Sequence, residues 1–146
     1  MRTLLAWILA LVSFPLTNAI VFVLMVPFDR VESALQQGGK SAEEWRALGV
    51  LCPGERVAWL SFVFGVIRTA ISKTVAVLVA AHIFHLFGHA MPLLLVLLVA
   101  ALAVLRDVAR IIRFLGNSGV WTECGYLLGD LVGMTVGTVL ALRYIV

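Results

Sequence analysis

Charged residues are scarce in this sequence. Lys, Arg, Asp and Glu make up 13% of its 146 residues, whereas hydrophobic residues make up 62%. Soluble globular domains carry about 25% charged residues, and the mean hydropathy here is +1.08, so the composition excludes an ordinary soluble domain. The cations lie mostly beside apolar segments, where they orient helices and meet lipid head groups. We therefore expect an all-α integral membrane protein in the lipid bilayer, with no nucleic-acid partner.

Cysteine is also scarce, and signatures of catalysis or nucleotide binding are missing. Cys52 and Cys124 are too few and too far apart for a disulfide scaffold or a CxxC site. Gly39-Lys40-Ser41 resembles the end of a phosphate-binding loop, but Ala34 stands where that loop requires its first glycine. The serines have no nucleophile-elbow sequence around them. We therefore expect no enzymatic activity.

Long apolar runs predict four transmembrane helices in a single membrane domain that covers residues 1–146. The expected spans are about 3–28, 69–89, 91–105 and 120–142. The stretch before the second span is expected as an interfacial lead-in, because Arg68 and Lys73 interrupt an apolar run too long for one span. The third span is expected to continue as an amphipathic helix to Leu115.

A polar loop, residues 29–56, separates the first two spans. Asp29 with Glu32, and Ser41 with Glu44, have the spacing of capping boxes. We therefore expect this loop to lie in the cytoplasm and to carry short amphipathic helices.

The first apolar run has a competing interpretation as a cleaved signal peptide, because Thr17-Asn18-Ala19 resembles a small-residue cleavage site. The run continues to Phe28, which favours a retained span. Pro15 near its middle is expected to kink the helix and to turn Asn18 towards other helices.

A ladder of small residues occupies the last span. Gly125, Gly129, Gly133, Gly137 and Ala141 recur at a constant spacing of four. Each glycine would weaken a soluble helix by about 1 kcal/mol relative to alanine. In a membrane, small residues at this spacing let two backbones approach closely. We expect this face to pack on a helix of the same chain or of another molecule, with a pore-lining role as the alternative.

Ionisable residues within the spans predict a polar seam. Asp130 lies near the middle of the last span, where a charge usually has a partner or a water-filled cavity. Helical phase and depth place His82 beside Asp130. They place Arg68 beside Glu123, and Asn18 of the first span lies at a compatible depth. Such a seam either ties helices together or handles ions or protons.

Other charges are expected to face the head groups or to pair locally. Lys73 lies about 180° from His82 on the helix, so we expect its side chain to extend towards the head groups. Asp107 is placed to pair with Arg110 on the continuation of the third span.

Three histidines fall on one helix face: His82, His85 and His89. Residues at this spacing could ligate a transition metal or haem. Haem ligation would need a histidine from a second helix, and no other expected span has one, so a homodimer would be required. We therefore expect no cofactor, with a metal or haem as the alternative.

Together these patterns predict a function based on helix packing. We expect an accessory, immunity-type or assembly subunit of the cell (inner) membrane. It would self-associate as a homo-oligomer, or bind a partner membrane protein, through the glycine ladder. The alternative is a small channel or proton-coupled carrier that uses His82, Asp130 and Glu123 as a relay.

The distribution of cations predicts the orientation of the chain, and cysteine labelling tests it. Seven Lys and Arg residues lie in the first and third loops and two lie near the termini, which places both loops in the cytoplasm and both termini outside. We expect Cys52 to resist a membrane-impermeant thiol reagent in intact cells and to react in inverted vesicles. Labelling of Cys52 in intact cells would contradict this topology.

Overall fold

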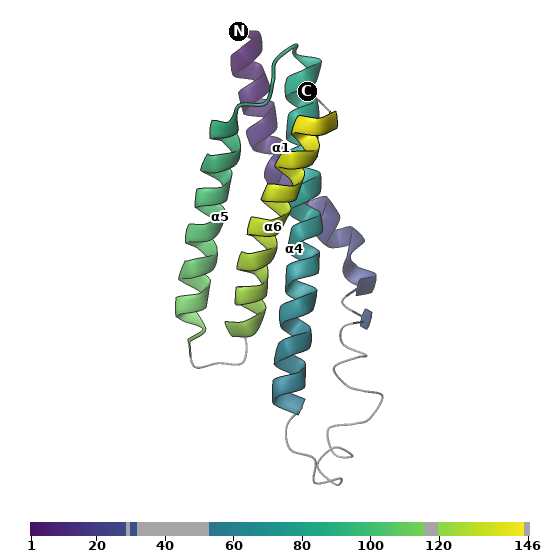
Figure 1. Cartoon of the computed structure of the whole chain (residues 1–146), viewed down its shortest axis with the longest axis vertical. Coiled ribbons are helices and arrows are strands. Elements are labelled where there is room, and N and C mark those ends of the chain that lie inside the picture. Colours follow the sequence, from purple (N-terminus) through teal and green to yellow (C-terminus); the bar gives the residue numbers. More distant parts are fainter. Residues whose placement is uncertain (29, 32–52, 116–119, 145–146) are drawn as a thin grey trace.

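A computed structural model of the chain describes residues 1–28, 30–31, 53–115 and 120–144. Four helices account for most of them: α1 (Arg2–Leu24), α4 (Pro53–Leu86), α5 (Leu93–Arg113) and α6 (Val120–Tyr144). No strand occurs within the described ranges. α1 and α5 run in one direction and α4 and α6 in the other, so the N-terminus and the end of α6 lie at the same end of the molecule (Figure 1).

Three helices are long and apolar enough to cross a membrane: Arg2–Leu24, Trp59–Leu86 and Val120–Arg143. The chain is thus a helical membrane protein with three candidate spans, where the sequence predicted four. α5 is not among them, because four charged residues lie in its C-terminal half: Arg106, Asp107, Arg110 and Arg113.

The second predicted span begins earlier than expected. The sequence predicted an interfacial lead-in over residues 57–67 and a span from residue 69, but α4 is one continuous helix across this boundary. Arg68 and Lys73 do not interrupt the helix, because both side chains are buried against neighbouring helices. The short helices predicted within the loop 29–56 lie outside the described residues.

α6 lies against α4 along its glycine ladder, and the two helices are parallel. A methyl group built on Gly137 would lie 3.1 Å from the Cα of Thr74. The other glycines meet α4 in the same way, in register: Gly125 faces Phe62, Gly129 faces Val66 and Gly133 faces Ala70. The helix that fills the groove is therefore α4 of the same chain. Ala141, the last residue of the ladder, is buried.

Hydroxyl groups of α4 reach backbone carbonyls of α6 across this contact. The Oγ1 of Thr74 donates to the carbonyl of Gly133 at 3.2 Å, and the Oγ1 of Thr69, which is 2.8 Å from the carbonyl of Gly65 in its own helix, also lies 3.3 Å from the carbonyl of Tyr126. These hydrogen bonds depend on the small separation of the two backbones, which only glycine permits.

An apolar core fills the half of the bundle nearer the termini. It joins residues from all four helices: Ala6, Ala10, Phe14, Ala76, Val77, Ala80, Phe84, Leu95, Val96 and Met134. The rings of Trp7 and Phe84 meet edge to face at 5.9 Å between centroids. α4 ends here at Leu86, and Gly88 two residues later has a φ of +74°, which allows a Schellman turn in which the N–H of His89 donates to the carbonyl of Phe84.

Substitution at Gly133 tests the close contact of α4 and α6. A methyl group there would meet the carbonyl of Ala70 and lie 2.8 Å from the Cβ of Lys73, so Gly133→Ala forces the helices apart. We expect a loss of about 1–3 kcal/mol, measured as a lower melting temperature in detergent. Thr135→Val, at an exposed position of the same helix, serves as the control. Equal melting temperatures for both variants would contradict this packing.

Candidate functional site

Four charged side chains from three helices meet inside the bundle. Asp130 of α6 accepts from the Nη2 of Arg106 at 3.1 Å, and the Nζ of Lys73 lies 3.7 Å from the same oxygen, Oδ2. Arg106 also contacts Asp107 at 2.7 Å, so one guanidinium lies between the two carboxylates. We call these four residues the ionic cluster. With two cations and two carboxylates its formal charge is zero, which is the condition for keeping charges out of water.

The packing of α6 on α4 positions two members of the ionic cluster. Gly133 lies directly against Lys73, and Asp130 precedes Gly133 by one helical turn. Because a side chain at residue 133 would meet the Cβ of Lys73, the glycine lets the base of the Lys73 side chain lie against α6 near Asp130. α5 completes the cluster by packing beside α6 (Figure 1).

Burial distinguishes Arg106 from the other three members of the ionic cluster, and Lys73 is 6% exposed. Asp107 and Asp130 are 0% and 1% exposed, whereas 46% of the Arg106 side chain is exposed. Each carboxylate also has one oxygen, Oδ2 of Asp107 and Oδ1 of Asp130, without a hydrogen-bond partner among the described residues. A buried carboxylate oxygen without a partner is costly, so this site has capacity for a further donor or a proton.

A groove opens beside the ionic cluster. It has a volume of about 270 Å³, and its polar lining consists of Lys73, Arg106 and Asn18. Asn18 accepts a hydrogen bond from the Oγ of Ser72 at 2.6 Å. Asn18 therefore does face another helix, as the sequence predicted. Its partner there is the hydroxyl of Ser72 on α4. The two carboxylates do not line the groove.

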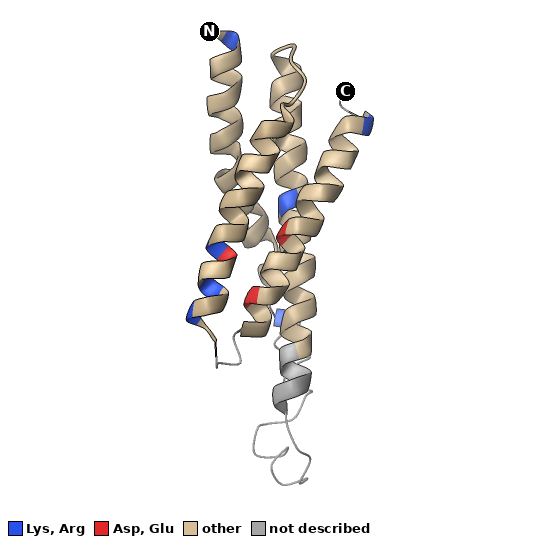
Figure 2. Cartoon of the chain, turned by 60° about the vertical axis from the view of Figure 1, so that its left-hand side comes forward, with Lys and Arg blue, Asp and Glu red and all other residues tan. Residues whose placement is uncertain are grey.

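A second ion pair lies closer to the connection between α5 and α6. The Nη1 of Arg110 is 3.8 Å from the Oε2 of Glu123, and the guanidinium of Arg68 lies 5.3 Å from the ring centroid of Phe22 on α1. Apart from Arg2 and Arg143 at the ends of α1 and α6 near the termini, the charges of the described helices lie in the middle and in this half of the bundle, as Figure 2 shows. Glu123 therefore forms its ion pair with Arg110 of α5. The sequence had predicted Arg68 of α4 as its neighbour.

The structure corrects the partner of Asp130. The predicted partner His82 is exposed and lies about 13 Å further along α4 than Lys73 at 1.5 Å per residue. Lys73, which was expected to extend to the head groups, is 6% exposed and occupies the place assigned to His82. Asp107 is likewise paired with Arg106, whereas the sequence predicted Arg110.

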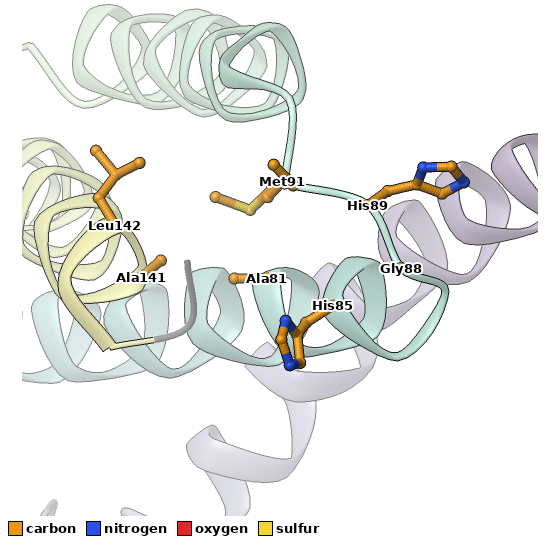
Figure 3. Close-up of a pocket in the computed structure, with 8 residues that line it drawn as sticks. Ala81, His85, Gly88, His89, Met91, Ala141 and Leu142 are labelled. Carbon is orange, nitrogen blue, oxygen red and sulfur yellow. The ribbon is translucent and has the colours of Figure 1, made fainter.

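The three histidines do not converge. His85 and His89 line a separate pocket of about 260 Å³ at the terminal end of the bundle, together with Met91, and their rings point in different directions (Figure 3). The Nε2 of His89 lies 3.2 Å from the Oγ1 of Thr3. Within the described ranges no group of three or more His, Cys, Asp or Glu residues is arranged to hold a metal ion.

Sequence reasoning missed three of the four cluster residues, although a signal was present. Asp107 follows Val96 and Ala103, both buried, at helical spacings of seven and four. It therefore continues the buried stripe of α5. Lys73 falls between Ala70 and Val77, which both face the glycine ladder. Helical phase relative to the packing face, rather than relative to the histidines, would have identified both residues.

The fold and the ionic cluster define a class: a helical membrane protein with a charge-balanced site inside its bundle. Comparison with known proteins does not refine this class, because no protein-family model, no curated protein and no solved structure matches the chain.

A double-mutant cycle tests the coupling within the ionic cluster. Asp130→Asn leaves Lys73 buried without a counter-charge, so we expect a loss of about 3–5 kcal/mol. Adding Lys73→Met removes the uncompensated charge and should restore part of the stability, measured by thermal unfolding in detergent. Glu123→Gln is the control, with a loss below about 1 kcal/mol, because its partner Arg110 is half exposed. Additive losses for the two substitutions would show that the residues are not coupled.

Proposed function

We propose that the protein is a small channel or proton-coupled carrier that acts through its ionic cluster. The supporting observation is the pair of buried carboxylates, each with a free oxygen, beside two cations and a groove. Lys73 lies near the middle of the candidate span Trp59–Leu86. Ionisable residues at such a depth are costly and mark ion or proton pathways in many membrane proteins.

The chemistry of the four residues gives each a distinct role. Arg106 cannot lose its proton, so it holds the two carboxylates together as a permanent charge. Lys73 and Asp130 are 3.7 Å apart, longer than a hydrogen bond, and both can exchange a proton. The relay is therefore assigned to Lys73, Asp107 and Asp130, in place of the expected relay through His82 and Glu123. The proposal includes no enzymatic reaction and no cofactor.

The apolar core gives this proposal a direction. Beyond the ionic cluster towards the termini, the interior is filled by apolar side chains such as Phe84 and Met134. The Arg110–Glu123 pair lies nearer the loops, and the groove lies at the depth of the ionic cluster, with Phe14 belonging both to its lining and to the core. In the proposed function the site opens through the groove and is closed towards the termini by the apolar core, which is one of the states that alternating access requires.

The proposal includes a fourth span and an orientation. α5 has 21 residues, about 31 Å of helix at 1.5 Å per residue, which matches a hydrocarbon core about 30 Å thick. Its charges at Arg106 and Asp107 are compensated within the bundle. We assign the chain to the cell (inner) membrane as a single four-span domain with both termini outside, on the cation distribution of the loops.

A second candidate function is an accessory, immunity-type or assembly subunit that binds itself or another membrane protein. The observation that favours it is the exposure of α1. Only 17% of the residues in its most apolar 18-residue stretch are buried. Since α4 covers the glycine ladder, the partner surface in this case is α1, and not the glycine face.

Flux measurements in reconstituted vesicles test the carrier proposal. We expect the wild type to carry a pH-dependent flux that Asp130→Asn and Asp107→Asn reduce at least about tenfold, because both remove a site for the proton. Glu123→Gln, outside the ionic cluster, should retain flux. Absence of flux in the wild-type protein would overturn the proposal.

Copurification in mild detergent separates the two candidates. A carrier loses flux in Asp130→Asn while its elution profile stays unchanged. An assembly subunit shows no flux and loses its partner when bulky polar residues replace exposed residues of α1, for example Leu4→Gln and Ile8→Gln.

A further inference from the structure

The groove beside the ionic cluster lies between α1 and α5, with Lys73 of α4 at its base. Both flanking helices contribute apolar residues: Leu11, Phe14 and Pro15 from α1, and Val99, Leu102 and Ala103 from α5. Its polar groups are the ammonium of Lys73, the guanidinium of Arg106 and the amide of Asn18. Cations and apolar walls are thus combined in one cavity within the depth of the candidate spans.

We propose that this groove binds a single-chain amphiphile with a carboxylate head, such as a medium-chain fatty acid anion. The carboxylate lies between Lys73 and Arg106, and the hydrocarbon chain runs along the apolar walls.

The preference for an anion follows from which charges face the cavity. Asp107 and Asp130 compensate the two cations from the opposite side and do not line the groove. Lys73 is held loosely, 3.7 Å from Asp130, so its donors are available to a second acceptor. Arg106 contacts both carboxylates and still leaves 46% of its side chain exposed, so its guanidinium remains accessible from the groove that it lines. A carboxylate accepts hydrogen bonds from both cations.

The size of the groove favours a carboxylate over a phospholipid head. Its volume of about 270 Å³ lies just below the usual range of ligand pockets, about 300–1,000 Å³. A phosphodiester carries a glycerol and two chains, whereas a carboxylate is a compact head on one chain. The six apolar lining residues supply the surface that such a chain buries.

This inference rests on the proposed carrier function, because it names the class of substrate that the carrier would transport. A bound carboxylate would compete with Asp130 for Lys73. When it displaces Asp130 from that contact, Asp130 loses a counter-charge and takes up a proton, which couples the two ligands.

Binding of decanoate to the purified full-length protein in nanodiscs tests the proposal by calorimetry. We expect saturable binding of decanoate, at least about tenfold weaker binding of acetate, which lacks the chain, and of decanol, which lacks the charge. Phosphatidylglycerol added to the nanodiscs should not displace decanoate. Equal affinity for acetate or decanol, or displacement by the lipid, would overturn the proposed ligand class.

Two variants locate the site. Lys73→Met removes a head-group partner, and Leu102→Trp blocks the groove at an exposed position without changing its charges. Each should weaken decanoate binding at least about tenfold. Leu105→Trp is the matched control, since Leu105 is also exposed on α5 but does not line the groove. Unchanged binding in Leu102→Trp would place decanoate elsewhere.

The binding and flux measurements test the ligand and the carrier function separately. Decanoate binding without flux in vesicles would retain the site and reject the carrier function. Proton flux without decanoate binding would retain the carrier function and reject this substrate class.

Discussion

Close contact between the backbones of α4 and α6 determines how the other charged and apolar residues are arranged. The glycine ladder lets α4 approach until its threonine hydroxyls reach carbonyls of α6. Because the helices are parallel, each turn of one meets the corresponding turn of the other. Lys73 and Asp130 are brought together by this register, and α5 then adds the remaining two charges. The ionic cluster is therefore a consequence of helix packing as much as of charge attraction.

Different interactions hold the helices together in the two halves of the bundle. Near the termini, alanines and aromatic rings fill the interior, and dispersion contacts hold the helices together. Nearer the loops, two carboxylates of α6, Asp130 and Glu123, are compensated by arginines of the neighbouring α5.

Much of the fold could be predicted from sequence, and less of the site. The lengths of the apolar runs predicted the helices. In lipid the backbone polar groups must hydrogen-bond within the protein, and an α-helix is one of the few structures that satisfy them. The glycine spacing predicted a close helix contact, but not its partner. The site was harder, because helical phase and depth allow several pairings, and the choice among them depends on crossing geometry. His82 and Lys73 lie on opposite faces of α4, and only the position of α6 decides which of the two meets Asp130.

The charges of α5 also bear on how the protein enters the membrane. Arg106 and Asp107 would oppose insertion of α5 alone, since each carries a high cost in hydrocarbon. Asp130, which with Asp107 is paired to Arg106, follows in the next helix of the chain. In the proposed four-span arrangement, α5 and α6 form one unit of insertion, a helical hairpin with the Arg106–Asp130 ion pair between its two helices. In that arrangement α4, which precedes them in the chain, supplies Lys73 and the surface that packs on the glycines of α6.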